Sequence, residues 1–135
     1  MAVVPSILLT IISLQSCQQK KEATDLLSDS YIEVEGDSVK DFGTYQASKG
    51  EQKLARFVIR NVGTDPLVIQ HINTGCGCTT VSFRKSPIMP DDTTHIIVKF
   101  DGTGLAYGSF YKEISVTSNA RSGLLRLAIK GTRQE

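Results

Sequence analysis

The sequence is poor in the residues on which many catalytic and nucleic-acid-binding sites depend. It has no Trp, two His and three Cys in 135 residues. Neither a Gly-x-Ser-x-Gly nor a His-Glu-x-x-His motif is present, and two histidines leave no plausible catalytic triad. Its 15 basic and 14 acidic side chains give a formal net charge of +1, so no overall field attracts nucleic acid. We therefore expect a non-enzymatic protein without a cofactor, a nucleic-acid partner or an identifiable small-molecule substrate.

The first 16 residues contain no charged side chain. This apolar run has the length of a signal peptide and is shorter than a bilayer span. It ends in Leu14-Gln15-Ser16-Cys17, which resembles the lipobox of bacterial lipoproteins. We expect residues 1–16 to be a lipoprotein-type signal peptide and Cys17 to receive the lipid, palmitate included. Because no Lys or Arg precedes the apolar run, we also expect the true start of the protein to lie upstream. A buried segment of the domain or an uncleaved membrane anchor remains the alternative.

Residues 17–30 are polar except for one Leu pair, and they are predicted to form a tether. Several acyl chains on Cys17 would hold the protein firmly to a membrane, because anchoring becomes stable with more than one chain. Gln18 is not the Asp that retains some lipoproteins at the inner membrane. We therefore expect a membrane-anchored lipoprotein of the cell envelope, at the outer membrane or the periplasmic face, whose partner is another envelope protein.

From Tyr31 onward, apolar residues recur at every second position in short runs separated by Gly, Pro, Asn or Asp. This pattern is typical of antiparallel strands. The predicted strands are Tyr31–Val34 or Ser38–Phe42, then Lys53–Val62, Leu67–Ile72, Thr79–Phe83, Thr94–Phe100, Ser109–Ser118 and Leu124–Lys130. About seven short strands predict an all-β, immunoglobulin-like antiparallel β-sandwich over residues 31–135. The Cys and Trp pair of antibody domains is missing, so the likeness is one of architecture.

The alternation also predicts which side chains face the core. The expected inward residues are Ala55, Phe57, Ile59, Ile96, Val98, Phe100, Phe110, Ile114, Val116, Leu125, Leu127 and Ile129. Residues 102–108 are rich in glycine, but a strand rather than a helix follows them. They are therefore predicted to form a hairpin loop and not a dinucleotide-binding turn.

Several short motifs occur in a characteristic order between Asp41 and Gly131. They are Asp41-Phe42-Gly43, Phe57-Val58-Ile59-Arg60-Asn61 with Gly63, Pro66-Leu67-Val68-Ile69, Cys76-Gly77-Cys78-Thr79, Pro87-Ile88-Met89-Pro90, Ile97-Val98-Lys99-Phe100-Asp101 and Ile129-Lys130-Gly131. In this order the chain resembles the bacterial domain of unknown function 1573 family. The resemblance implies an immunoglobulin-like fold that commonly follows an export or lipoprotein signal, and it implies no established biochemical role. Asp91 stands where the family usually has Gly, and Asp can adopt the left-handed conformation such a turn needs.

Cys76 and Cys78 form the most distinctive feature for chemistry. On an extended chain both sulfurs face one side, and their Cα atoms lie roughly 6.6 Å apart, near the upper limit for a disulfide. A bridge would therefore require a bend at Gly77. Two thiolates could instead bind copper as Cu(I), with His71 as a further ligand, because Cu(I) accepts two or three soft ligands. The third alternative is a pair of buried free thiols. A copper-binding or thiol-redox protein is thus the alternative to a binding or structural role.

Overall fold

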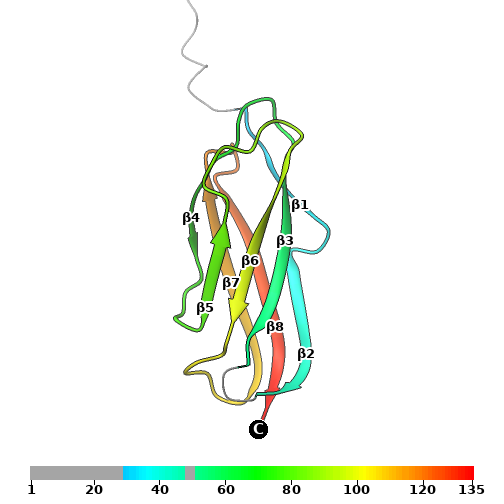
Figure 1. Cartoon of the computed structure of the whole chain (residues 1–135), viewed down its shortest axis with the longest axis vertical. Coiled ribbons are helices and arrows are strands. Elements are labelled where there is room, and N and C mark those ends of the chain that lie inside the picture. Colours follow the sequence, from blue (N-terminus) through cyan, green and yellow to red (C-terminus); the bar gives the residue numbers. More distant parts are fainter. Residues whose placement is uncertain (1–28, 48–50) are drawn as a thin grey trace, which may run out of the picture.

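The computed structural model describes residues 29–47 and 51–135, which form two packed β-sheets (Figure 1). Its eight strands are β1 (Ile32–Glu35), β2 (Val39–Gln46), β3 (Lys53–Asn61), β4 (Ile69–Asn73), β5 (Thr79–Phe83), β6 (Thr93–Phe100), β7 (Gly108–Ser118) and β8 (Leu124–Gln134). The described residues contain no helix, which agrees with the predicted all-β sandwich. The two alternative leading segments are both strands, so the sandwich has eight strands where about seven were expected.

Each sheet has four strands. Sheet A has the order β1-β3-β6-β5 and sheet B the order β2-β8-β7-β4. All pairs are antiparallel except β2 with β8, which run parallel. This departs from the antiparallel expectation. The chain passes from sheet A to sheet B between β1 and β2, at Gly36 with its left-handed φ of 87°, and β2 then runs alongside β8 in the same direction. The β6–β7 connection also joins the two sheets, so residues 102–108 form a crossover and not the predicted hairpin loop.

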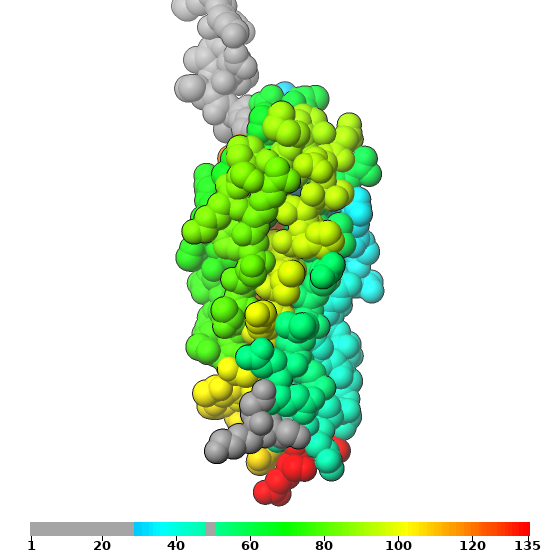
Figure 2. Space-filling model, viewed as in Figure 1, coloured from blue at the N-terminus to red at the C-terminus, as the bar shows by residue number. Residues whose placement is uncertain are grey.

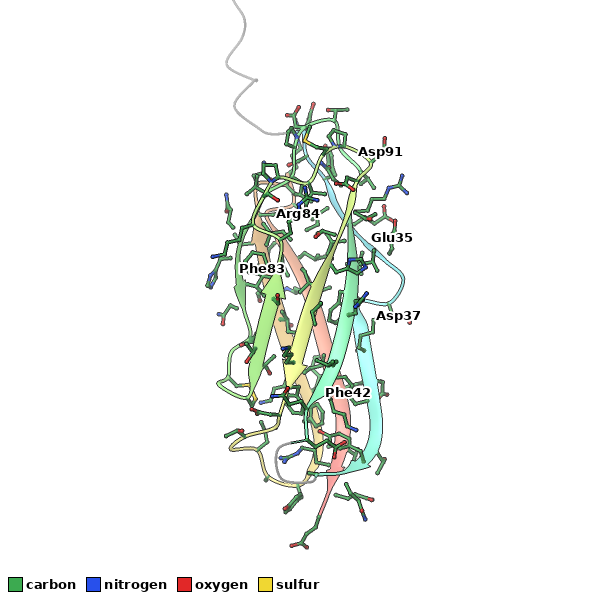
Figure 3. The ribbon with its side chains drawn as sticks, viewed as in Figure 1. Glu35, Asp37, Phe42, Phe83, Arg84 and Asp91 are labelled. Carbon is green, nitrogen blue, oxygen red and sulfur yellow. A yellow bond between two sulfur atoms is a disulfide. The ribbon has the colours of Figure 1, made fainter. Side chains whose placement is uncertain are left out.

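The core is one layer of apolar side chains between the sheets. The inward residues predicted on β3 and β6 are at most 3% exposed, and those on β7 and β8 are buried except for the half-buried Leu125. Phe42 lies at the lower end of the sandwich (Figure 3), where its ring centre is 6.1 Å from that of Phe100. Phe100 in turn stacks on Phe110 at 4.6 Å. The period-two prediction of the core is therefore confirmed.

Asn61, the last residue of β3, is a fully buried polar side chain that holds two loops together. Its amide group donates hydrogen bonds to the carbonyl oxygens of Asp65 (2.8 Å) and Ile88 (2.9 Å). Its side-chain oxygen accepts one from the Gly63 N–H at 3.0 Å. Because its donors and its acceptor are all used, this buried amide fixes the loops after β3 and before β6 instead of destabilising the core.

The chain enters the domain against the loop after β3. The Thr64 N–H donates to the Asp29 carbonyl at 3.0 Å, and Ser30 is fully buried. A Cβ on Gly63 would come within 2.1 Å of the Asp29 carbonyl oxygen, so only glycine permits this approach. Asp29 and Ser30 were assigned to the tether by the sequence, but in the structure they pack on the folded module.

Asp91 has a φ of 64°, the left-handed conformation that the sequence required of it. The Asp92 N–H closes the turn by donating to the Met89 carbonyl at 3.0 Å. The Asp91 carboxylate lies 3.2 Å from Arg60, which is also 3.8 Å from Glu35 on β1. Figure 3 shows Glu35 and Asp91 on the same side of the domain. The prediction that the turn forms with Asp in place of Gly is confirmed.

Replacement of the buried amide tests its role as a structural link. We expect Asn61→Ala to lower the free energy of unfolding by about 2–4 kcal/mol, because the three hydrogen bonds of a fully buried side chain are lost and a cavity is left in its place. Asn73→Ala, which removes one exposed bond to the Gly75 N–H, is the matched control and should cost less than about 1 kcal/mol. Urea unfolding curves measure both values. Equal losses in the two variants would contradict the assignment.

Candidate functional site

The connection between β4 and β5 carries the cysteine pair and crosses from sheet B to sheet A. Cys76 and Cys78 form a disulfide with their Cα atoms 5.4 Å apart. This spacing is shorter than that of an extended chain, because the backbone turns at Gly77 and Cys78. The Asn73 side chain starts the loop by accepting a hydrogen bond from the Gly75 N–H at 3.0 Å, and Gly75 has a φ of 68°. The bend that a bridge requires is therefore present, at the start of β5 (Figure 3).

The two cysteines have different environments. Cys78 is 3% exposed and belongs to the core cluster, whereas Cys76 is half-buried and packs against the edge of that cluster. Cys76 lies between Gly75 and Gly77, and a Cβ built on either glycine would meet nothing within 4 Å. The space on both sides of Cys76 along the chain is thus open. Cys78 is thus shielded by the core, whereas Cys76 keeps part of its surface exposed.

Two threonines hold the disulfide loop. The Thr79 hydroxyl lies 3.5 Å from the Cys76 sulfur and 3.7 Å from the Cys78 sulfur. The Thr74 hydroxyl is positioned to donate to the carbonyl oxygens of Cys76 (3.2 Å) and Thr79 (3.4 Å). Thr79 is 8% exposed, so its hydroxyl acts in a largely dry environment. The sequence alone assigned no role to either threonine. The position of Thr79 directly after the second cysteine is the one signal that could have indicated a contact with the pair.

The structure does not bring His71 to the cysteines. His71 is exposed on β4 and pairs with Thr117 of β7, while its neighbour Ile72 packs against the core. Since successive side chains of a strand point to opposite faces, His71 lies on the outer face of sheet B. Within residues 29–47 and 51–135, no three His, Cys, Asp or Glu side chains are grouped so that they could hold a metal ion. Copper binding by Cys76 and Cys78 stays a prediction for the reduced pair.

The disulfide closes a loop too short to account for the stability of the domain. The two cysteines are separated by two positions. In the chain-entropy model, such a loop of three residues stabilises by about 1.6 kcal/mol, against about 3 kcal/mol for a loop of 15 residues. A domain of this length buries a core without a staple. The bridge therefore has little value as a structural reinforcement.

A polar pocket of about 280 Å³ opens where β2 carries a bulge between Asp41 and Thr44. Its charged groups are paired, because the Asp41 carboxylate lies 3.4 Å from the Lys130 ammonium. The Gly43 N–H donates to this carboxylate at 2.8 Å and holds the pKa of Asp41 below its usual value. The Ser109 and Thr132 hydroxyls are likewise 3.0 Å apart. With its polar groups already paired, the pocket is a weaker candidate site than the cysteine loop.

Cys17, the predicted lipid-bearing residue, lies outside the described residues, as do the predicted signal peptide and most of the predicted tether. In the part of the chain that the structure describes, no helix is long and apolar enough to cross a membrane.

The two four-stranded sheets define an immunoglobulin-like β-sandwich domain. The chain belongs to the family of proteins of unknown function DUF1573, which matches residues 32–133. This establishes the family that the ordered motifs predicted. No curated protein matches the chain.

Solved structures of low sequence identity share the fold. A protein of unknown function from Porphyromonas gingivalis W83 is 24% identical with a TM-score of 0.66, and the match covers 82% of this chain and 51% of that one. The ASH/PapD-like domain 7 of human CEP192 is 13% identical with a TM-score of 0.58, covering 97% and 99% of the two chains. The Vibrio cholerae VesB protease is 12% identical with a TM-score of 0.56, covering 79% and 32%. This chain thus spans about half of the Porphyromonas structure, and these likenesses concern the fold.

Reduction of the bridge tests whether it reinforces the fold. In the full chain carrying Cys17→Ser, we expect dithiothreitol to lower the free energy of unfolding by about 1.6 kcal/mol and to leave the domain folded, because the closed loop is short. Urea unfolding with and without the reductant gives the value. A Cys76→Ala, Cys78→Ala variant is the control and should not respond to dithiothreitol. Loss of the folded state on reduction would contradict the short-loop argument.

Proposed function

We propose that the chain is an exported, lipid-anchored protein of the cell envelope whose single immunoglobulin-like module has a non-enzymatic binding role. Family membership and the PapD-like likeness support a binding or structural module. The observation that carries the binding role is β5, an edge strand of sheet A that lacks the usual features protecting an edge from a further strand. The partner that fits such an edge is an extended segment of another protein.

The other three edge strands carry features that discourage strand addition. β1 has two glutamates in four residues, β2 has the bulge between Asp41 and Thr44, and β4 has a register shift between Ile69 and His71. β5 has the sequence Thr-Thr-Val-Ser-Phe, with no charge, proline or bulge, and it pairs with β6 in unbroken register. Charges and bulges are the features by which proteins blunt sheet edges. β5 is therefore the edge most open to a partner strand.

The pairing register shows which backbone groups of β5 are available. The Asp101 N–H donates to the Cys78 carbonyl at 3.1 Å, so Cys78 and every second residue after it face β6. The N–H and C=O groups of Val81 and Phe83 consequently face away from β6. Thr79 follows the same alternation, and its carbonyl is directed to the Thr74 hydroxyl. In the space-filling view, the green atoms of this part of the chain form the left side of the visible face (Figure 2).

The lipid anchor rests on the apolar run and on Leu14-Gln15-Ser16-Cys17. Twelve positions separate Cys17 from Asp29, where the described part of the module begins. A fully extended segment of that length reaches at most about 40 Å. The module would therefore stay near the membrane surface, within reach of other envelope proteins.

Labelling with palmitate tests the anchor. We expect Cys17→Ala to abolish palmitate incorporation and to release the protein from the membrane fraction, because the acylated residue is lost. The Cys76→Ala, Cys78→Ala variant is the control and should be labelled like the unchanged chain. Labelling that persists in Cys17→Ala would contradict the assignment of the lipid site.

Proline substitutions on two edges of the same sheet test the docking strand. Val81 and Val34 are half-buried residues of β5 and β1, and the N–H group of each faces away from its neighbouring strand. The unchanged chain is immobilised and used to capture binding proteins from envelope extract. We expect Val81→Pro to abolish this capture, because it removes a docking N–H group. Val34→Pro should leave the capture unchanged. Circular dichroism checks that both variants fold. Equal recovery by both variants, or equal loss, would exclude β5 as the docking edge.

A further inference from the structure

We propose that Cys76 and Cys78 form a thiol–disulfide exchange site in which Cys76 is the sulfur that reacts with a partner. The partner is a protein that carries two cysteines, as a dithiol or as a disulfide. This proposal goes beyond the binding role and does not depend on docking at β5. It rests on the unequal burial of the two cysteine residues, the glycines on either side of Cys76 and the hydroxyl group shared by both sulfurs.

The exchange balances with a dithiol partner and no other reactant. A partner thiolate attacks the Cys76 sulfur, the bond between Cys76 and Cys78 breaks, and its electron pair leaves on the Cys78 sulfur, which takes up a proton. The second partner thiolate then attacks the partner sulfur of the mixed disulfide and releases Cys76 as a thiolate, which takes up a proton, so that the two protons lost by the dithiol balance those gained by the pair. The partner is oxidised to its disulfide and the pair is reduced to two thiols, a transfer of two electrons. With a disulfide partner the same steps run in reverse.

Access explains why Cys76 is the reacting sulfur. Cys78 is 3% exposed among core side chains, so an external thiolate cannot approach it in line with the bond. Cys76 is half-buried and lies between two glycines. Gly75 has a positive φ that accounts for its identity, but Gly77 has neither a positive φ nor a neighbour within 4 Å of a Cβ. A glycine at position 77 therefore leaves room for a second chain beside Cys76.

Thr79 is a positioning residue for the exchange. Its hydroxyl lies 3.5 Å from the Cys76 sulfur and 3.7 Å from the Cys78 sulfur. A hydroxyl has one proton, so it donates to whichever sulfur is the thiolate at a given step. A hydrogen bond to the charged form lowers the pKa of a thiol, and burial raises it. The shared hydroxyl thus offsets the cost of releasing Cys78 as a thiolate inside the core.

Single-cysteine variants test which sulfur reacts. The probe is oxidised glutathione, added at neutral pH to the reduced full chain carrying Cys17→Ser. We expect Cys78→Ala to form the glutathione adduct at Cys76 at least tenfold faster than Cys76→Ala forms it at Cys78, as followed by mass spectrometry. Circular dichroism confirms that both variants are folded. Equal rates, or no adduct at Cys76, would overturn the proposal.

A second experiment separates a positioning role of Thr79 from simple packing. In the Cys78→Ala background, the rate of Cys76 alkylation by iodoacetamide is measured as a function of pH. We expect Thr79→Val to move the midpoint of this profile to higher pH, Thr79→Ser to restore it, and Thr80→Val, on the exposed neighbouring residue, to leave it unchanged. An unmoved midpoint in Thr79→Val would overturn the role of the hydroxyl.

A third measurement distinguishes exchange from copper binding. The reduced chain with Cys17→Ser is mixed with one equivalent of Cu(I), passed through a desalting column and then exposed to oxidised glutathione. We expect the protein to emerge without copper and to regain the disulfide. Retention of one copper ion per chain together with failure to reoxidise would overturn the proposal in favour of a metal site.

Discussion

The two sheets meet through one layer of buried apolar side chains, and the rest of the domain depends on this layer. Phe57 and Ile59 on one sheet and Ile114 and Ile129 on the other have no exposed surface. Burying side chains of this size stabilises by about 1.5–3 kcal/mol each. In the part of the chain that the structure describes, side chains fill the space between the sheets at these positions. The proposed recognition and exchange sites accordingly lie at a sheet edge and in a loop that crosses between the sheets.

In the loop from β4 to β5, one cysteine of the disulfide lies in the core and the other lies at its edge. Cys78 is anchored among the apolar side chains, whereas Cys76, which is bonded to it, is only half-buried. The anchor fixes the position of the loop, and the Thr74 hydroxyl fixes its backbone. Because β5 begins at the next residue, the same short segment supplies both the disulfide and the least protected edge of sheet A.

Local periodicity was enough to predict the inward side chains of β3 and β6 and the fold class, because alternation along a strand reports directly on burial. It could not predict the parallel pairing of β2 with β8, since pairing partners are not encoded in a period. For the same reason the β6–β7 crossover was assigned as a hairpin. At the cysteines, the extended-chain distance lay near the disulfide limit and left three alternatives open. The contact of Thr79 with both sulfurs depends on the turn at Gly77, which spacing alone did not reveal.

The chain enters the sandwich at one end, and the disulfide loop lies at the other. Asp29 is hydrogen-bonded to the loop after β3, and Asn61 at the start of this loop bonds to Asp92, just before β6. Cys78 bonds to Asp101, just beyond the other end of β6. The eight residues of β6 lie between the two points, which are nine residue steps and therefore roughly 31 Å apart at about 3.4 Å per residue. In the lipid-anchored form proposed above, the disulfide loop therefore lies at the end of the sandwich opposite to the one at which the tether enters, so the length of the module separates the cysteine pair from the point of attachment.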